Sequence, residues 1–198
     1  MTSILTKLAE EKSATDLQLL SRDSYRWIED KISELKRTSS IPASLAKENS
    51  RQASRFRLGQ MYFFYYDPKG KSDLPYYDRF PLVIMLEKYQ DGFLGLNLHY
   101  LPLKYRVAFL SKLVSLAVFS AENEIKRVRA TYDILNATRR FKEFRPCLKR
   151  YLLPHIRSRI LEVQPNEWEI ATHLPIHQFK KASPKEVWQD SMNEIKKA

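Results

Sequence analysis

Hydrophobic residues form short clustered runs in the middle of this chain and recur at helical spacing on either side of it. Within residues 59–102 the runs are rich in aromatic and branched residues, and Asp-Pro, Leu-Pro, Asp-Gly and single glycines separate them. This pattern is typical of β-strands joined by turns. We therefore predict a small antiparallel β-sheet or an SH3-like barrel over about residues 59–101, with strands at 61–66, 80–86 and 93–101.

Two of these runs carry more detail. The run from Phe80 to Leu86 is hydrophobic throughout, so we expect both of its faces to be covered. From Phe93 onward hydrophobic residues alternate with Asn97 and His99, which predicts one apolar face and one polar face. The turn at 89–92 between the two runs predicts a hairpin. All four glycines of the chain fall in this β-unit, at Gly59, Gly70, Gly92 and Gly95.

Helical spacing appears on both sides of the β-unit. Ser21 is a good cap for a helix through Lys36, with an apolar stripe that includes Ile28 and Ile32. After Pro102 the period changes from two to about 3.6, which predicts helices near 103–117 and 125–135. A closing helix begins at Ser183, and its capping box and apolar stripe are formed by Pro184, Glu186, Trp188, Met192 and Ile195.

The predicted fold class is therefore α+β. Residues 1–54 form an N-terminal helical arm and linker, and residues 55–198 form a single α+β domain. That domain has three parts, which are the β-unit (59–101), a mainly helical basic segment (102–160) and a C-terminal segment with the closing helix (161–198). We expect prolines 146 and 154 to keep the helices of 145–160 short.

Composition narrows the class of protein. A chain of 198 residues with 43% hydrophobic residues is long enough for one sizeable core. The single cysteine, Cys147, excludes an intramolecular disulfide and a zinc site built from cysteines, and we expect it to be a buried packing residue. No run resembles a membrane span or a signal peptide, so we expect no membrane partner and no secretion.

Charge is distributed unevenly along the chain. The net charge is +11, and residues 104–159 hold 14 Lys and Arg against four acidic residues, while the rest holds 20 against 19. Such a concentration is expected where one surface meets a polyanion. The candidate nucleic-acid-binding residues are Lys126, Arg127, Arg129, Arg139, Arg140, Lys142, Arg145, Lys149, Arg150, Arg157 and Arg159.

Arginine can grip phosphate with two donors, and the interleaved aromatic residues could stack on exposed bases. The sequence contains no signature of sequence-specific readout, so binding would be mainly to backbone phosphates. The alternative is that the arginines are a solvated face or contact acidic proteins. Tyr76 and Tyr77 are candidate interface residues, and burial in the core is the alternative for both.

Evidence for catalysis is weak. Asp67, Asp73, Asp78, Glu87 and His99 lie near predicted strand ends, but their spacing matches no nuclease motif, and turns and local pairing explain them as well. His173 and His177 have helical metal-ligand spacing, but Pro175 separates them and no third ligand is apparent. We predict no enzyme activity, no metal site and no cofactor.

The central motifs also carry a family resemblance. Tyr-Asp-Pro-Lys, Leu-Pro-Tyr-Tyr-Asp-Arg-Phe-Pro-Leu and Asp-Gly-Phe-Leu-Gly-Leu-Asn-Leu-His-Tyr-Leu-Pro, followed by Tyr105-Arg106, resemble a conserved virion protein of T4-type (marine) tailed bacteriophages, and most closely the DNA end protector family. The resemblance is dense over 59–106 and looser over 151–178.

The resemblance implies a non-enzymatic virion protein that binds double-stranded DNA or its ends without sequence specificity and shields packaged ends near the head-tail junction. It also implies other virion proteins as partners, oligomeric assembly, and presence in the host cytoplasm during assembly. Two alternatives remain at this stage. One is a structural subunit of the neck, tail or baseplate with protein contacts only, and the other is a head-completion nuclease.

Overall fold

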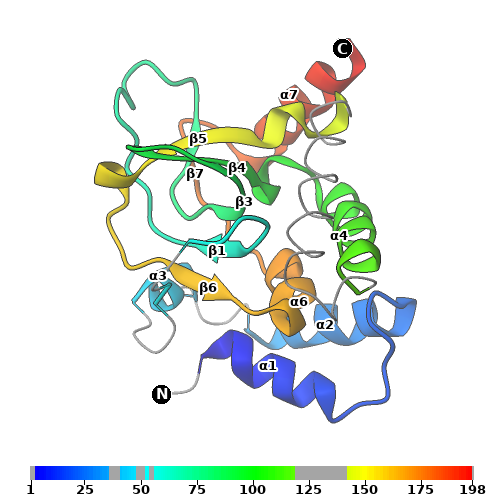
Figure 1. Cartoon of the computed structure of the whole chain (residues 1–198). Coiled ribbons are helices and arrows are strands. Elements are labelled where there is room, and N and C mark those ends of the chain that lie inside the picture. The colour runs from blue at the N-terminus through cyan, green and yellow to red at the C-terminus, as the bar shows by residue number, and fades with distance from the viewer. Residues whose placement is uncertain (1–2, 36–40, 48–51, 54–55, 119–141, 198) are drawn as a thin grey trace.

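The structure is a computed structural model that describes residues 3–35, 41–47, 52–53, 56–118 and 142–197 (Figure 1). A five-stranded antiparallel sheet has the order β5-β4-β3-β1-β6, and β2 and β7 form a separate two-stranded antiparallel sheet. The strands are β1 (Met61–Phe63), β2 (Tyr77–Asp78), β3 (Leu82–Lys88), β4 (Gly92–Asn97), β5 (Leu148–Leu152), β6 (Leu161–Val163) and β7 (Phe179–Lys180).

Helices complete the α+β architecture that the sequence predicts. The α-helices are α1 (Ile4–Ser13), α2 (Arg22–Leu35), α3 (Ile41–Ala46), α4 (Leu103–Val118), α6 (Trp168–His173) and α7 (Pro184–Lys197). Short 3-10 helices are η1 (Leu98–Tyr100), η2 (Lys142–Cys147), η3 (Leu153–His155) and η4 (Pro165–Glu167). Within the described residues, no helix has the length and apolar character needed to cross a membrane.

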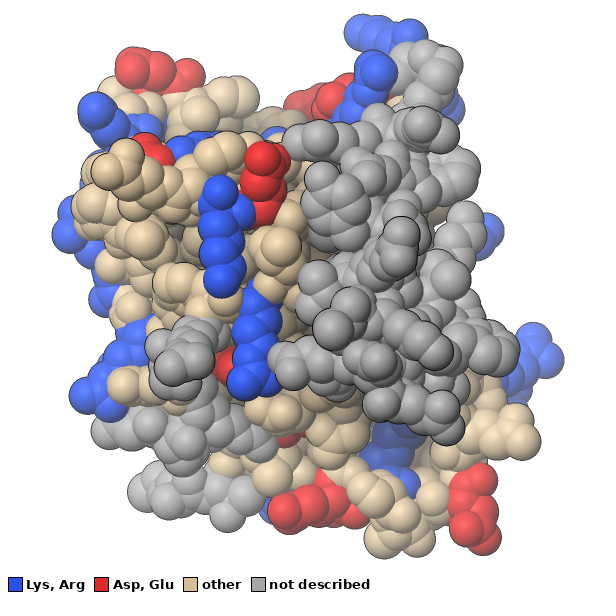
Figure 2. Space-filling model, in the orientation of Figure 1, with Lys and Arg blue, Asp and Glu red and all other residues tan. Residues whose placement is uncertain are grey.

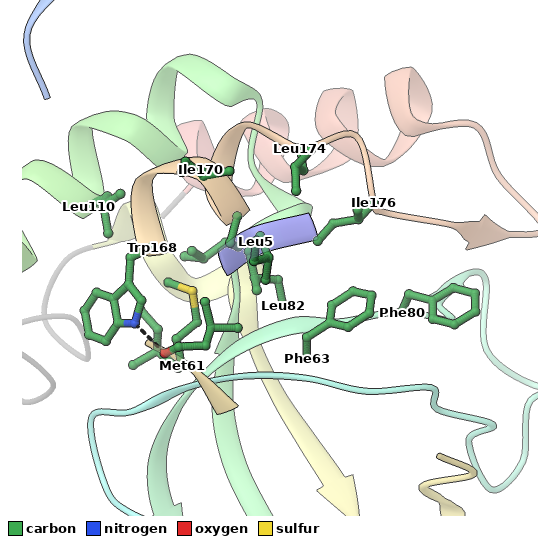
Figure 3. Packing of buried hydrophobic residues seen from close by; sticks show 14 of the residues in the cluster. Leu5, Met61, Phe63, Phe80, Leu82, Leu110, Trp168, Ile170, Leu174 and Ile176 are labelled. Carbon is green, nitrogen blue, oxygen red and sulfur yellow. Dashed lines mark hydrogen bonds between the residues drawn. The ribbon is translucent and has the colours of Figure 1, made fainter. Parts of the chain in front are cut away.

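Strand alternation separates two hydrophobic clusters on the two faces of the sheet. On one face, Met61 and Phe63 of β1 and Leu82 of β3 pack with residues of α1, α4 and α6 (Figure 3). On the other face, Tyr62, Phe64, Val83 and Met85 form a second cluster with Phe93 and Tyr151. The continuous hydrophobicity of β3 is thereby explained, because both of its faces are covered.

The N-terminal helices share the main cluster with the sheet. Leu5 of α1 and Ile28 of α2 are almost fully buried in it. Glu169 of α6 is also buried, where it forms an ion pair with Lys12 of α1 and accepts a hydrogen bond of 2.7 Å from the Ser24 hydroxyl of α2. One carboxylate therefore joins α1, α2 and α6, and these helices lie near one another in Figure 1.

The predicted helix caps and the hairpin are confirmed. The Ser21 hydroxyl accepts the backbone N–H of Ser24 at 3.1 Å, and α2 begins at Arg22. Ser183 and Glu186 form the reciprocal hydrogen bonds of a capping box at the start of α7. The β3–β4 hairpin closes through a hydrogen bond of 2.8 Å from Tyr89 N–H to the Gly92 carbonyl.

The boundaries of all three predicted strands are wrong, and the strand predicted over 80–86 is β3 (Leu82–Lys88). The strand predicted over 61–66 ends at Phe63 as a regular element, and Tyr66 makes only an isolated bridge. The strand predicted over 93–101 ends at Asn97, whose side chain accepts the backbone N–H of His99 and starts the 3-10 helix η1. An asparagine that bonds its own backbone two residues on favours a turn over continued pairing.

The sheet also extends beyond the predicted β-unit. β5, placed by the sequence in a helical segment, pairs with β4, and β6 pairs with β1. Within the described residues β5 and β6 do not pair with each other, so the structure has the open sheet and not the SH3-like barrel. The helix predicted near 125–135 lies outside the described residues.

Candidate functional site

Only part of the predicted basic surface falls in the region that the structure describes. The remaining candidates lie in 119–141 and outside the described residues, namely Lys126, Arg127, Arg129, Arg139 and Arg140. Lys142 belongs to η2, where only its backbone is described. The geometry of the surface therefore rests on Arg145, Lys149, Arg150, Arg157 and Arg159.

Four arginines are exposed before, within and after β5. Arg145 lies in η2 and Arg150 in β5, while Arg157 and Arg159 precede β6. The connection from β5 through η3 to β6 runs along one end of the sheet, at the left in Figure 1. In the same orientation, Figure 2 shows lysine and arginine side chains along this margin and across the centre of the face.

Arg150 has partners on the protein itself. Its guanidinium forms an ion pair with Asp91 and lies 3.9 Å from the centre of the Tyr89 ring, which is itself exposed. A guanidinium over an aromatic face is attracted to it through a cation–π contact. Arg150 is thus an exposed guanidinium, paired with Asp91 and placed over the Tyr89 ring, at the β5 edge of the sheet.

Lys149 differs from these arginines because its side chain points into the molecule. Its ammonium nitrogen lies 4.2 Å from the centre of the Tyr100 ring, and burial lowers the pKa of Lys149 below its ordinary value. The two interface candidates are half-buried. The Tyr76 ring lies 6.1 Å from that of Tyr100, and Tyr77 pairs with Lys180 in the small sheet.

A buried polar cluster lies where η1 meets the small sheet. The Asp78 carboxylate accepts hydrogen bonds from the backbone N–H groups of Phe80 and Gln178, from Asn97 at 3.2 Å and from His99 at 2.7 Å. Burial alone would raise the pKa of Asp78, but His99 and these hydrogen bonds hold that pKa below its ordinary value. Burial lowers the pKa of His99, so its imidazole is neutral and donates from Nδ1.

Next to this cluster, Arg106 of α4 is only 2% exposed. Its Nε donates to the Leu101 carbonyl at 2.6 Å and its Nη2 donates to the His99 carbonyl at 3.2 Å. The guanidinium lies 5.5 Å from the centre of the Trp188 ring. Burial lowers the pKa of Arg106 to about 10, so the side chain still carries its charge at neutral pH.

Arg106 lines a cavity of about 400 Å³ between α2, α4, α6 and α7. The other polar side chains in its wall come from Glu29, Ser33, His173, His177 and Trp188. Trp188 donates its indole N–H to the His99 carbonyl at 2.9 Å, which fixes the ring in the wall. His177 Nδ1 is buried and has no hydrogen-bond partner.

Three of the four carboxylates considered as metal ligands are separately engaged. Asp67 pairs with Lys71 at 2.9 Å, Glu87 accepts a hydrogen bond from the Tyr89 hydroxyl, and Asp78 belongs to the buried cluster. Among the residues that the structure describes, no group of three or more His, Cys, Asp or Glu side chains is arranged to hold a metal ion. Cys147 is buried, as predicted, and burial raises its pKa to about 12.

Sequence reasoning missed the Arg106 cavity and the Asp78 cluster. One signal was present, because the alternation after Phe93 places Asn97 and His99 on the same face, and both side chains contact Asp78. Arg106 was counted with the basic segment, although its charge lies inside the protein. An arginine on the apolar stripe of a predicted helix is the signal that would have separated it from the surface arginines.

Comparison with known proteins adds one finding. A sequence model of the family described as phage T4 terminal DNA protecting protein matches residues 4–191. No curated protein and no solved structure matches the chain. The family match covers the N-terminal helices, the sheet and most of α7, whereas the motif resemblance was confined to residues after Gly59.

Proposed function

The chain belongs to the family of phage T4 terminal DNA protecting proteins, and we propose that it binds the ends of packaged double-stranded DNA and covers them against exonucleases. The match over residues 4–191 is the observation that carries this proposal. The family is one of bacteriophage proteins that protect DNA ends, a role in the virion. DNA binding by this chain and its place at the head-tail junction are parts of the proposal.

The proposed mechanism is occlusion. Exposed arginines at positions 145, 150, 157 and 159 contact backbone phosphates, which requires no sequence readout. With a net charge of +11, the chain attracts DNA electrostatically, and the range of this attraction decreases as the salt concentration rises. A protein seated on a terminus denies an exonuclease the end on which it must load, and no bond is made or broken.

Other virion proteins are the proposed partners of the chain in the particle, where it acts as part of a larger assembly. During assembly it is present in the host cytoplasm. Tyr76 and Tyr77 are the proposed contact residues for such partners, since each is half-buried and lies beside the exposed loop 69–75. No cofactor takes part in this function.

Protection of ends is tested directly with the purified full chain. A linear duplex is incubated with the protein and then with a processive double-strand exonuclease, and a closed circle of the same sequence serves as competitor. We expect the linear duplex to survive and the circle to compete poorly. Equal competition by circles would contradict recognition of ends and support general DNA binding. Absence of any binding at low salt would contradict DNA binding altogether and support a structural subunit with protein contacts only.

Magnesium is included in one arm to test the nuclease alternative. Cleavage of the duplex by the protein that depends on magnesium would replace the occlusion mechanism with an enzymatic one. The same outcome would also contradict the prediction that the chain is not an enzyme. We expect the duplex to remain intact with and without magnesium over the time of the protection assay.

A further inference from the structure

The cavity beside Arg106 has the size and wall chemistry of a small-ligand site. Its volume of about 400 Å³ lies within the range of roughly 300–1,000 Å³ that such sites occupy. The wall comes from four helices that are far apart in the sequence, and an apolar part from Ile32, Leu103 and Leu174 surrounds the polar groups. A duplex cannot enter a space of this size, but a single nucleotide can.

Arg106 supplies a buried positive charge to this cavity. Two of its N–H groups are used by the Leu101 and His99 carbonyls, and the other donors of the guanidinium have no partner within the described residues. Among the described residues Arg106 also forms no ion pair with a carboxylate, although the charge of Asp78 acts on it and raises its pKa against the effect of burial. Burying a charge without a directly paired counter-ion is costly, so an anion in the cavity that accepts hydrogen bonds from the remaining Arg106 donors would be stabilised there.

The other wall groups select the kind of anion. The Trp188 ring, held by its hydrogen bond to His99, offers a flat surface on which a base can stack. His177 brings a buried nitrogen without a partner, and Glu29 and Ser33 bring acceptors from α2. A bare phosphate offers nothing to the Trp188 ring or to the Glu29 carboxylate, whereas a nucleotide brings a base and amino or hydroxyl donors.

We propose that this cavity receives the terminal nucleotide of a DNA end, with its 5′-phosphate on the Arg106 guanidinium and its base against Trp188. The inference rests on the proposed function and deepens it, because it explains how an end is told from the interior of a duplex. Only a terminus presents a phosphate monoester and a nucleotide that can leave the stack by fraying. The exposed arginines then hold the flanking duplex through its backbone.

The first test varies the DNA and leaves the protein unchanged. Two blunt duplexes of identical sequence, one with 5′-phosphate and one with 5′-hydroxyl ends, are titrated with the full chain at fixed salt. We expect the phosphorylated ends to bind at least tenfold more tightly. Equal affinities would overturn the inference, and the end-protecting function would stand as long as linear duplexes are still preferred over circles.

The second test varies the protein. Arg106→Met keeps roughly the length of the side chain and removes its charge, and it should abolish the preference for 5′-phosphate over 5′-hydroxyl ends. Arg145→Gln is the matched control, because it removes an exposed arginine outside the cavity and should preserve the preference. A preference that survives in Arg106→Met would overturn the assignment of the phosphate to Arg106.

A third arm separates a DNA end from a free nucleotide. The thermal melting temperature of the full chain is measured with a deoxynucleoside 5′-monophosphate, with the corresponding nucleoside and with inorganic phosphate. The inference expects the monophosphate to raise the melting temperature more than the other two, with the effect lost in Arg106→Met. Stabilisation by the monophosphate without any preference for phosphorylated duplex ends would assign the cavity to a free nucleotide and overturn its role in end recognition.

Discussion

At the scale of single residues, the charged and titratable groups inside the protein are compensated in different ways. Glu169 is met by Lys12, Ser24 and the backbone N–H of Leu20, and Asp78 is met by His99, Asn97 and two backbone N–H groups. Arg106 donates hydrogen bonds to two backbone carbonyls and lies over an aromatic ring. The first two groups hold helices and strands together, while Arg106 retains donors toward a cavity.

Replacing Glu169 should therefore be strongly destabilising. Glu169→Ala leaves the Lys12 ammonium buried without a counter-ion, and breaking such a pair from one side costs about 3–5 kcal/mol. The loss is measured by urea denaturation of the purified variant. Glu10→Ala, on the exposed side of α1, is the control and should change the free energy of unfolding by less than about 0.5 kcal/mol.

His177 should make stability depend on pH. Burial chiefly, with His99 and Arg106, lowers the pKa of His177 from 6.5 to about 3, although Asp78 acts in the opposite direction. Between pH 6.5 and pH 3 His177 is protonated in the unfolded chain but neutral in the folded chain. The contribution of this group to the free energy of unfolding is therefore complete above pH 6.5 and decreases as the pH falls toward 3. From pH 7 to pH 5 the loss from this group is about 2 kcal/mol.

Denaturant unfolding at pH 7 and pH 5 measures this dependence. His177→Phe keeps an aromatic ring among Trp188, His99 and Phe179 and removes a nitrogen that has no hydrogen-bond partner. The variant should be close to wild type at pH 7 and should lose less stability at pH 5. An unchanged loss in the variant would assign the effect to His99 or His173, whose pKa values burial also lowers.

At the scale of elements, two glycines of β4 are required by close approach. A Cβ on Gly92 would collide with the backbone carbonyl of Tyr151 in β5, and a Cβ on Gly95 would collide with the Val83 side chain of β3. A side chain can rotate away, but a paired strand has to move as a whole. The position of β5 beside β4 therefore depends more on Gly92 than on Gly95.

Alanine substitutions should show this difference. We expect Gly95→Ala to cost about 1–3 kcal/mol, as overpacking does in other cores, and Gly92→Ala to cost more. Thermal unfolding of the two variants provides the comparison. Gly70→Asn is the control, because Gly70 has a φ of 65° that asparagine tolerates and a Cβ there would meet only Asp73 at 3.6 Å.

The elements that sequence patterns predicted are those whose signal is local. A continuous apolar run located β3, a period-two alternation located β4, and period-3.6 patterns located α2, α4 and α7. Capping residues located the starts of α2 and α7. β5 was missed because Lys149 and Arg150 interrupt its apolar pattern and prolines flank it. β6 has only three residues, which is too short for a periodic signal.

The site was less predictable for a related reason. Charge along the chain located the basic segment but not which of its residues are exposed: Arg145, Arg150, Arg157 and Arg159 are exposed, whereas Arg106 is buried and Lys149 half-buried. The cavity is lined by residues of α2, α4, α6 and α7, which lie far apart in the sequence. Its wall forms only when these helices pack together, and no local sequence pattern indicates that packing. The pairing of Asp78 with His99 likewise crosses between separate elements.

At the scale of the whole molecule, the excess charge predicts a steep salt dependence of DNA binding. Each arginine that neutralises a phosphate contributes about 0.9 to the slope of log K against log salt concentration. Replacing Arg145, Arg157 and Arg159 together by glutamine should therefore flatten the slope by up to about 2.7. The slope is obtained from binding of a linear duplex over a series of salt concentrations.

The control removes the same charge elsewhere. Arg22, Arg26 and Lys185 are exposed on α2 and α7, outside the basic segment, and their replacement by glutamine should leave the slope nearly unchanged. Equal flattening by both triple variants would show that net charge alone governs binding. It would then contradict the assignment of the DNA contacts to the basic segment.

The order of strands in the sheet also bears on the synthesis of the protein. β1, β3 and β4 leave the ribosome first, and both strands that cover their edges, β5 and β6, are translated only after residue 147. Until then the three-stranded sheet β4-β3-β1 has two unpaired edges, at β4 and at β1, which can pair with other chains. The nascent protein is consequently most prone to aggregation while the ribosome is translating the region between β4 and β5, and slow translation there would lower the yield of folded protein.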